Sequence, residues 1–135
     1  MEFSVLISVY QRERPQYLKQ ALDSLYVQIV PPSEVVIVED GPLTDGLHAV
    51  INAFSTQHPT KIVRLPHNQG LGKALCEGLK HCRFPIVARM DSDDICMPRR
   101  FKKQLSIMEN TKVDIVGSWI DEFSGSKKHV VSTRK

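Results

Sequence analysis

The sequence lacks the patterns that mark several classes of protein. Its three cysteines form no C-x-x-C pair and leave an odd number, which favours a reducing cytoplasm. No apolar run approaches the roughly 20 residues that a membrane span requires. The chain starts directly in a β-rich segment, so we expect no signal peptide. The five histidines show no metal-ligand spacing, and no serine lies in a G-x-S-x-G elbow, so nucleophilic hydrolase chemistry has no support.

What is present is ordinary for a globular domain. The 135 residues are 41% hydrophobic and 24% charged, with a net charge of +3; they suffice for one domain but are few for a two-substrate enzyme. Basic residues gather at Arg99, Arg100, Lys102 and Lys103, and again at Lys127, Lys128, Arg134 and Lys135. Because they do not alternate regularly with aromatic residues, they argue against nucleic acid as a partner. They favour phosphate or the cytoplasmic face of a membrane.

Segments with strand and helix periodicity alternate along the chain. Buried strands are predicted at Phe3–Val9, Val35–Val38, Ile62–Leu65, Ile86–Met90 and about Val113–Trp119. Helices are predicted from Pro15, from Thr44 or Asp45, from about Gly70 and from Pro98. This alternation predicts an α/β fold with a parallel sheet built from right-handed βαβ units.

Helical spacing also predicts which side chains face the core. For the first helix these are Leu18, Ala21, Leu22, Leu25 and Ile29, and for the third Leu71, Leu75, Leu79 and Cys82. After the last predicted strand, Ser124–Lys128 is a polar turn that can bend a hairpin returning through Val130 and Val131.

Three carboxylates, Asp91, Asp93 and Asp94, follow the predicted strand Ile86–Met90. Because Pro98 favours the start of a helix, these acids are expected in a loop between a strand and a helix. In open parallel sheets the carboxyl ends of the strands form the edge where ligands bind. Clustered carboxylates raise each other's pKa unless a cation relieves them. The cluster therefore predicts a divalent metal, Mn²⁺ or Mg²⁺.

The three acids also allow interpretations other than a metal site. One is that they are solvated residues near a helix amino terminus, where negative charge is favoured. An EF-hand loop is excluded because Ile95 and Cys96 stand at its fifth and sixth positions. An aspartate-based, Mg²⁺-dependent phosphotransferase, with Asp91 as nucleophile, stays open as the enzymatic alternative.

Two further motifs lie at the same predicted edge. Gly70-Leu71-Gly72-Lys73 matches neither a Walker loop nor a dinucleotide fingerprint, which leaves a helix start packed on the sheet or one that faces a nucleotide with Lys73. Asp40, before Gly41, is either a turn-forming residue or a carboxylate that accepts the imide N–H of uracil. Tyr10 is placed to stack on such a base.

Taken together, four segments resemble the family 2 glycosyltransferases of GT-A fold. They are Ser4–Tyr10, Val35–Gly41, Asn68–Ala74, and Ala88–Asp94 followed by Met97–Phe101. The resemblance covers nearly the whole chain. It implies a Rossmann-like, three-layer α/β/α domain with a mostly parallel sheet. It also implies metal-dependent, inverting transfer of a sugar from a nucleoside diphosphate sugar, with UDP favoured, to a polysaccharide or lipid-linked glycan.

The resemblance also implies roles for single residues. Asp91-x-Asp93 becomes the metal-binding DxD motif, with Asp93 the direct ligand and Asp91 nearer the ribose, and Asp40 reads the base. The remaining expected nucleotide-binding residues are Val9, Tyr10, Glu13, Gly70, Lys73 and Ser92.

The chain departs from the family pattern in two motifs. Glu39-Asp40-Gly41-Pro42 replaces the usual Asp-Asp-Gly-Ser, and Glu77 stands where Asn is common. The catalytic base and the acceptor side are expected beyond residue 135. Residues 1–123 would then be the donor-binding portion, and 124–135 a polar turn and tail. A non-catalytic sugar-nucleotide-binding fragment is the alternative. Without the acceptor side, an apolar surface of the sheet would be left uncovered, which predicts self-association, for example as a homodimer.

Overall fold

The computed structural model describes residues 2–111, 120–123 and 130–134, and the chain divides into two compact units, Met1–Phe101 and Lys102–Lys135. The first unit contains a four-stranded sheet in the order β3-β2-β1-β4. Its strands are β1 (Ser4–Val9), β2 (Glu34–Glu39), β3 (Thr60–Arg64) and β4 (Val87–Asp91). Every pairing in this sheet is parallel, as predicted.

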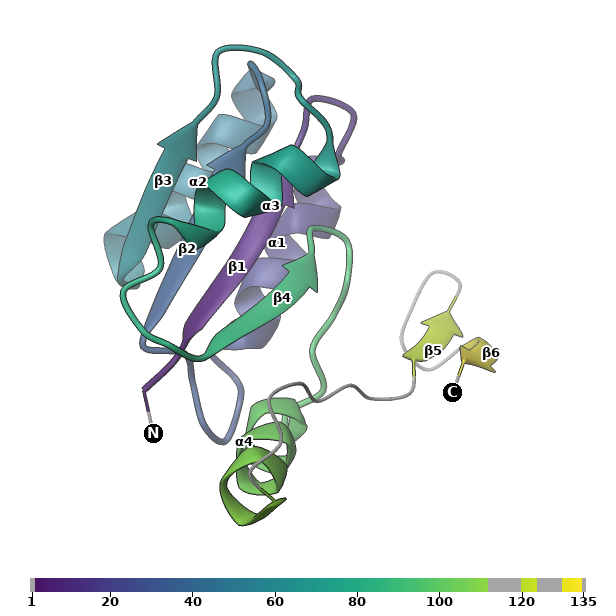
Figure 1. Ribbon diagram of the computed structural model, residues 1–135. Coiled ribbons are helices and arrows are strands. Elements are labelled where there is room, and N and C mark those ends of the chain that lie inside the picture. The colour runs from purple at the N-terminus through teal and green to yellow at the C-terminus, as the bar shows by residue number, and fades with distance from the viewer. Residues whose placement is uncertain (1, 112–119, 124–129, 135) are drawn as a thin grey trace. The chain divides into compact units, whose positions relative to one another are not determined.

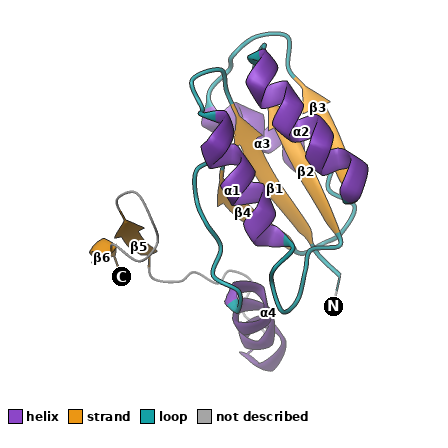
Figure 2. Cartoon of the chain, turned by 180° about the vertical axis from the view of Figure 1, so that it is seen from behind, coloured by secondary structure: helices purple, strands orange, loops and turns teal. Residues whose placement is uncertain are grey.

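Helices cover both faces of this sheet. The helices α1 (Pro15–Leu25) and α2 (Asp45–Gln57) lie on one face, and α3 (Leu71–Leu79) lies on the other (Figures 1 and 2). The helix α4 (Arg100–Thr111) follows β4 in the chain. This arrangement gives the expected three layers, with β1 and β2 as the central strands.

The central strands form because their residues are apolar on both faces, which suits a strand covered by helices on each side. Val5, Ile7, Val35 and Ile37 are fully buried, as are Val36 and Val38. On the α3 side, Leu6, Val36 and Val38 pack with Val63 and Ala74. Burial of this continuous core stabilises the sheet. The parallel pairing places the carboxyl ends of all four strands at one edge.

The face of α3 that packs on the sheet agrees with the prediction only in part. Leu75 and Cys82 pack against the core as expected. Leu71 and Leu79 are 50% and 54% exposed, whereas Ala74 and Gly78 are buried. A Cβ on Gly78 would lie 2.5 Å from side-chain atoms of both Leu6 and Val38. The helix therefore approaches the sheet through its small residues, and the expected row of leucines turns partly to solvent.

Several predicted boundaries also shift. The helix α1 ends at Leu25, where the Tyr26 amide donates to the Asp23 carbonyl, so Ile29 lies beyond the helix and is 52% exposed. The strand β4 extends to Asp91, which makes this acid the last strand residue rather than the first loop residue. The helix α4 begins at Arg100, two residues after Pro98.

The second unit contains a predicted hairpin. Strands β5 (Ile120–Phe123) and β6 (Val130–Arg134) pair antiparallel, as expected for a chain that returns through Val130 and Val131. The predicted strand Val113–Trp119 and the predicted turn Ser124–Lys128 lie outside the described residues. No helix in the described ranges combines the length and apolar character needed to cross a bilayer.

Candidate functional site

A cavity of about 530 Å³ opens at the carboxyl edge of the sheet. Its lining residues come from the carboxyl ends of β1 and β4, the loops after all four strands, and the first turns of α1 and α3. They are Ser8, Tyr10, Arg12, Glu13, Arg14, Tyr17, Asp40, Asn68, Gly70, Leu71, Met90, Asp91, Ser92 and Asp93. The strand register explains why they meet, since Val9 pairs with Glu39 and Ser8 pairs with Asp91. As predicted, the strand ends that carry Asp40 and Asp91 lie at one edge.

Most of the residues predicted to bind nucleotide or metal line this cavity. They are Tyr10, Glu13, Asp40, Gly70, Asp91, Ser92 and Asp93. Val9 and Lys73 are not among the lining residues. Val9 is fully buried and its carbonyl accepts a hydrogen bond of 2.8 Å from the Asp40 amide, while Lys73 is exposed on the first turn of α3. The roles of Val9 and Lys73 stay predictions.

Neighbouring arginines balance only part of the negative charge on the acids of the DxD segment. Asp91 and Asp93 are exposed, and Arg89 Nη2 donates to Asp91 Oδ1 at 3.2 Å. Burial raises the pKa of Asp94, and the neighbouring carboxylates of Asp91 and Asp93 raise it further. A cation bound at this loop would relieve the repulsion among the three acids.

The protein side chains at this loop can hold a hard divalent cation only if a bound molecule supplies further oxygen ligands. Within the described part of the chain, no three His, Cys, Asp or Glu side chains are arranged to hold a metal ion by themselves. Carboxylate oxygens are nevertheless the ligands that Mg²⁺ and Mn²⁺ prefer. The acids Asp91 and Asp93 thus fit a site that phosphate oxygens and water would complete, and their role as metal ligands stays a prediction.

The carboxylate of Asp40 holds two loops together. Its Oδ1 accepts from the Gln69 amide at 2.7 Å, and its Oδ2 accepts from the Gly70 amide at 3.2 Å. Gly41 has φ +88°, and a Cβ there would lie 2.7 Å from the Asn68 amide nitrogen. Because these partners lie on a distant loop, Asp40 is more than the local turn former considered above.

Glu13 and Ser92 contact each other across the site. Ser92 Oγ donates to Glu13 Oε2, and the Arg14 amide donates to Glu13 Oε1 at 2.9 Å. This contact joins the loop after β1 to the middle of the DxD segment. A direct contact of either side chain with a nucleotide stays a prediction.

Sequence reasoning missed several residues that line the cavity. Arg12 and Arg14 flank Glu13 and are the cationic members of the lining, and the Arg14 guanidinium lies 5.5 Å from the centre of the Tyr17 ring. Asn68 and Leu71 line it from the loop after β3 and the start of α3. The sequence signal that could have identified both arginines is their position shortly after strand β1.

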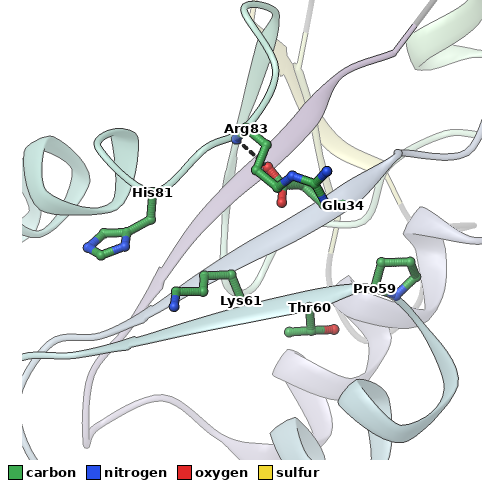
Figure 3. A pocket seen from close by; sticks show the side chains of 6 residues that line it. All are labelled: Glu34, Pro59, Thr60, Lys61, His81 and Arg83. Carbon is green, nitrogen blue, oxygen red and sulfur yellow. Dashed lines mark hydrogen bonds between the residues drawn. The ribbon is translucent and has the colours of Figure 1, made fainter.

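A second cavity, of about 510 Å³, lies at the amino-terminal ends of β2 and β3 (Figure 3). Its lining residues are Glu34, Pro59, Thr60, Lys61, His81 and Arg83. The buried acid Glu34 is already satisfied, because its Oε2 accepts from Ser4 Oγ and from the Arg83 amide, each at 2.6 Å. None of the predicted site residues lies there, so the candidate site is the cavity at the carboxyl edge.

Comparison with protein families and curated proteins gives a consistent result. The model of the family described as glycosyl transferase family 2 matches residues 4–135. An uncharacterized glycosyltransferase of Haemophilus influenzae is 46% identical over 135 residues, covering 99% of this chain and 51% of the relative. The amylovoran biosynthesis glycosyltransferase AmsE of Erwinia amylovora is 48% identical over 122 residues, covering 90% and 46%.

An Escherichia coli relative has a name that states its donor and acceptor. It is the UDP-Gal:alpha-D-GlcNAc-diphosphoundecaprenol beta-1,3-galactosyltransferase, which is 42% identical over 123 residues, covering 90% of this chain and 45% of the relative. The chain thus spans about half the length of the curated relatives it matches.

Solved structures show the same fold. TarS 1-349 of S. aureus in complex with UDP-GlcNAc has a TM-score of 0.73 and 27% identity, covering 87% of this chain and 37% of that one. The mannosyltransferase PcManGT of Pyrobaculum calidifontis, in complex with GDP-Man and Mn²⁺, has a TM-score of 0.72 at 22% identity, covering 83% and 33%. These likenesses confirm the predicted GT-A type of α/β fold, present here in part.

Proposed function

Because the chain belongs to glycosyl transferase family 2, we propose that it forms the donor-binding side of an enzyme that transfers a sugar from a nucleoside diphosphate sugar. The observation that carries this proposal is the meeting of Asp40, Asp91 and Asp93 at one cavity, from the ends of two strands. Family membership also removes the reason to pursue the aspartate-based phosphotransferase.

The cavity offers complementary groups for each part of such a donor. Tyr10 is 44% exposed at the lining and presents a ring on which a base can stack. Asp40 retains unused lone pairs on its two oxygens, so it can accept the imide N–H of uracil while it holds Gln69 and Gly70. We favour UDP for this reason, and because the E. coli relative is named for UDP-Gal and TarS is solved with UDP-GlcNAc.

The diphosphate belongs at the acidic end of the cavity. Asp93, with Asp91 beside it, would hold Mn²⁺ or Mg²⁺ together with diphosphate oxygens. The bound cation would act as a Lewis acid that stabilises the charge developing on the departing diphosphate. Arg12 and Arg14 add positive charge to the same lining, and a guanidinium can bind phosphate oxygens in a bidentate manner.

Transfer with inversion at the anomeric carbon is the proposed reaction. The bond between the sugar and the diphosphate breaks, a bond to an acceptor oxygen forms, and the acceptor proton passes to a general base. We assign that base to no residue of this chain. A lipid-linked glycan is the favoured acceptor, since one relative is named for a diphosphoundecaprenol-linked one. We also propose a location at the cytoplasmic face of a membrane, because a lipid-linked acceptor lies in a membrane.

A thermal-shift panel tests the donor and the metal together. UDP-, GDP-, dTDP- and CMP-sugars are added with Mn²⁺ and with EDTA. We expect a UDP-sugar to stabilise the chain only with Mn²⁺, by about 2.7 kcal/mol at a hundredfold excess over Kd. Equal stabilisation in EDTA would contradict the DxD assignment. Stabilisation by no nucleotide would contradict donor binding, and sedimentation of the same samples checks the expected self-association.

The competing proposal, a non-catalytic binding fragment, predicts the same thermal shifts. Activity separates the two. Transfer needs donor, acceptor and base held together, and this positioning alone can supply roughly 7–11 kcal/mol. We therefore expect this 135-residue chain to hydrolyse a donor slowly at most, and a longer protein that contains it to transfer sugar to an acceptor.

A further inference from the structure

The segment that follows the DxD acids is irregular but firmly held. Between the end of β4 at Asp91 and the start of α4 at Arg100, its backbone forms neither a helix nor a strand. Polar groups of such a backbone need partners when they are buried. Besides its own bonds from the Asp94 amide to Asp91 and from the Arg100 amide to Met97, the segment is held by residues at and just beyond the two ends of α1.

The amino-terminal end of α1 holds the first part of this segment. Glu13, two residues before α1, accepts the hydrogen bond from Ser92 Oγ. Ser92 is buried and lies between the two acids that the proposed function assigns to the metal. The first anchor is therefore inside the DxD motif itself.

The carboxyl-terminal end of α1 holds the second part through Gln28. Gln28 is 6% exposed, and its Nε2 donates to the carbonyls of Met97 at 2.7 Å and Cys96 at 3.2 Å. Gln28 Oε1 accepts from the Phe101 amide at 3.4 Å. One buried amide thus binds backbone groups on both sides of the turn that leads into α4.

Two neighbours of Gln28 reinforce this anchor. Ser24 Oγ accepts from the Cys96 amide at 3.0 Å and donates to the Ala21 carbonyl at 2.7 Å. The Ile29 amide donates to the Pro98 carbonyl at 2.9 Å. Residues at and just beyond both ends of α1 therefore hydrogen-bond the segment that runs from the DxD acids to the start of α4.

We propose that Gln28 is a positioning residue of the donor site, one that holds Asp91 and Asp93 at the spacing a metal-bound diphosphate requires. The inference rests on the proposed function. Gln28 is not among the residues that line the cavity, so it acts through the Cys96–Phe101 backbone and touches no ligand. Groups that hydrogen-bond a metal ligand directly change metal affinity by about 10- to 100-fold when they are removed. Because Gln28 acts through the backbone, we expect an effect near the lower end of this range.

The test uses Gln28→Met, which keeps the length and flexibility of the side chain but removes its hydrogen bonds. Gln20→Met, at an exposed position of α1, is the matched control for the substitution. Ile51→Ala, in the buried face of α2, is the control for loss of stability alone. All variants are studied well below their unfolding temperatures, as shown by circular dichroism.

Two readouts separate positioning from a merely structural role. Calorimetric titration of UDP at several Mn²⁺ concentrations gives the Mn²⁺ requirement for binding. We expect Gln28→Met to raise this requirement about tenfold or more, while both controls leave it unchanged. Hydrogen exchange without ligand should be faster for Gln28→Met in the peptide spanning residues 91–101, and Ile51→Ala should leave that peptide protected.

A Gln28→Met protein that is less stable but has the wild-type Mn²⁺ requirement would overturn the inference and leave the proposed function intact. A wild-type chain that binds no UDP at any Mn²⁺ concentration would overturn both. If Gln28→Met does not fold, Ser24→Ala removes only the bond to the Cys96 amide and its own bond to Ala21. Ser24→Ala should then raise the Mn²⁺ requirement, whereas Ser24→Thr, which keeps the hydroxyl, should have the wild-type requirement. An unchanged requirement in Ser24→Ala would contradict the inference.

Discussion

Replacing Asp40 removes the negative charge that joins the loop after β2 to the loop after β3. In Asp40→Ala both carboxylate contacts are lost, and the Gln69 amide loses its 2.7 Å acceptor. The Gly70 amide is affected less, because Asn68 Oδ1 also accepts from it at 3.2 Å. Asp40→Asn is milder still, since its remaining oxygen can accept from Gln69.

The size of the effect follows from these contacts. A hydrogen bond to a charged group contributes about 1.5–3 kcal/mol, and a buried donor without a partner costs about 1–3 kcal/mol. We expect Asp40→Ala to lose about 2–3 kcal/mol and Asp40→Asn about half of that. At about 4 °C per kcal/mol for a domain of this size, Asp40→Ala should lower the Tm by roughly 8–12 °C.

Thermal unfolding without ligand measures this loss, with Asp45→Asn as the control. Asp45 is an exposed acid in the first turn of α2, where removal of the charge should cost less than about 1 kcal/mol. Titration of UDP should show weaker binding to Asp40→Ala, with the need for Mn²⁺ intact. A Tm of Asp40→Ala within about 1 °C of the wild type would refute the reasoning, because that is the behaviour of an uninvolved surface residue.

Further predictions concern the acids and the close packing of α3. Asp93→Asn should abolish the Mn²⁺ dependence of UDP binding, and retention of this dependence in calorimetry would contradict its role as metal ligand. Because the folded-state pKa of Asp94 is raised, its contribution to stability is fully present below its unfolded pKa and is lost as pH rises through the folded value. Asp94→Asn should therefore raise the ligand-free Tm at neutral pH and flatten the dependence of Tm on pH in the acid range; an unchanged pH profile would argue against it. Gly78→Ala should destabilise by about 1–3 kcal/mol through overpacking against Leu6 and Val38, whereas Gly72→Ala, where a Cβ meets open space, should not destabilise in the same denaturant titration.

The sequence predicts the sheet well because its central strands have a simple physical signature. Val35–Val38 is apolar at every position, and such a run is stable as a strand only when both faces are covered. Once strands alternate with helices, parallel pairing follows, and with it the common edge for Asp40 and Asp91. The site is therefore predictable to the level of which strand ends meet.

What the sequence could not predict depends on contacts between distant residues. Leucine spacing marked Leu71 and Leu79 as core, but the distance between α3 and the sheet is set by Gly78, whose importance appears only beside Leu6 and Val38. The hydrogen bond between Glu13 and Ser92 and the bonds of Gln28 join segments far apart in the chain. No local periodicity encodes such pairs.

The position of β1 in the middle of the sheet also determines when the site can exist. Ser4 in β1 pairs with Glu34 in β2 on one side and with Val87 in β4 on the other. Of the four strands in this sheet, β1 is synthesised first, and its pairing is complete only after β4 has been synthesised. Pairings between residues so far apart form slowly, because closing the long intervening loop costs conformational entropy before the contacts can stabilise it. On the ribosome, where the amino-terminal part emerges first, a nascent chain that ends before β4 has Asp40 but no DxD segment. Donor binding by this domain would therefore mark the completion of its four-stranded sheet.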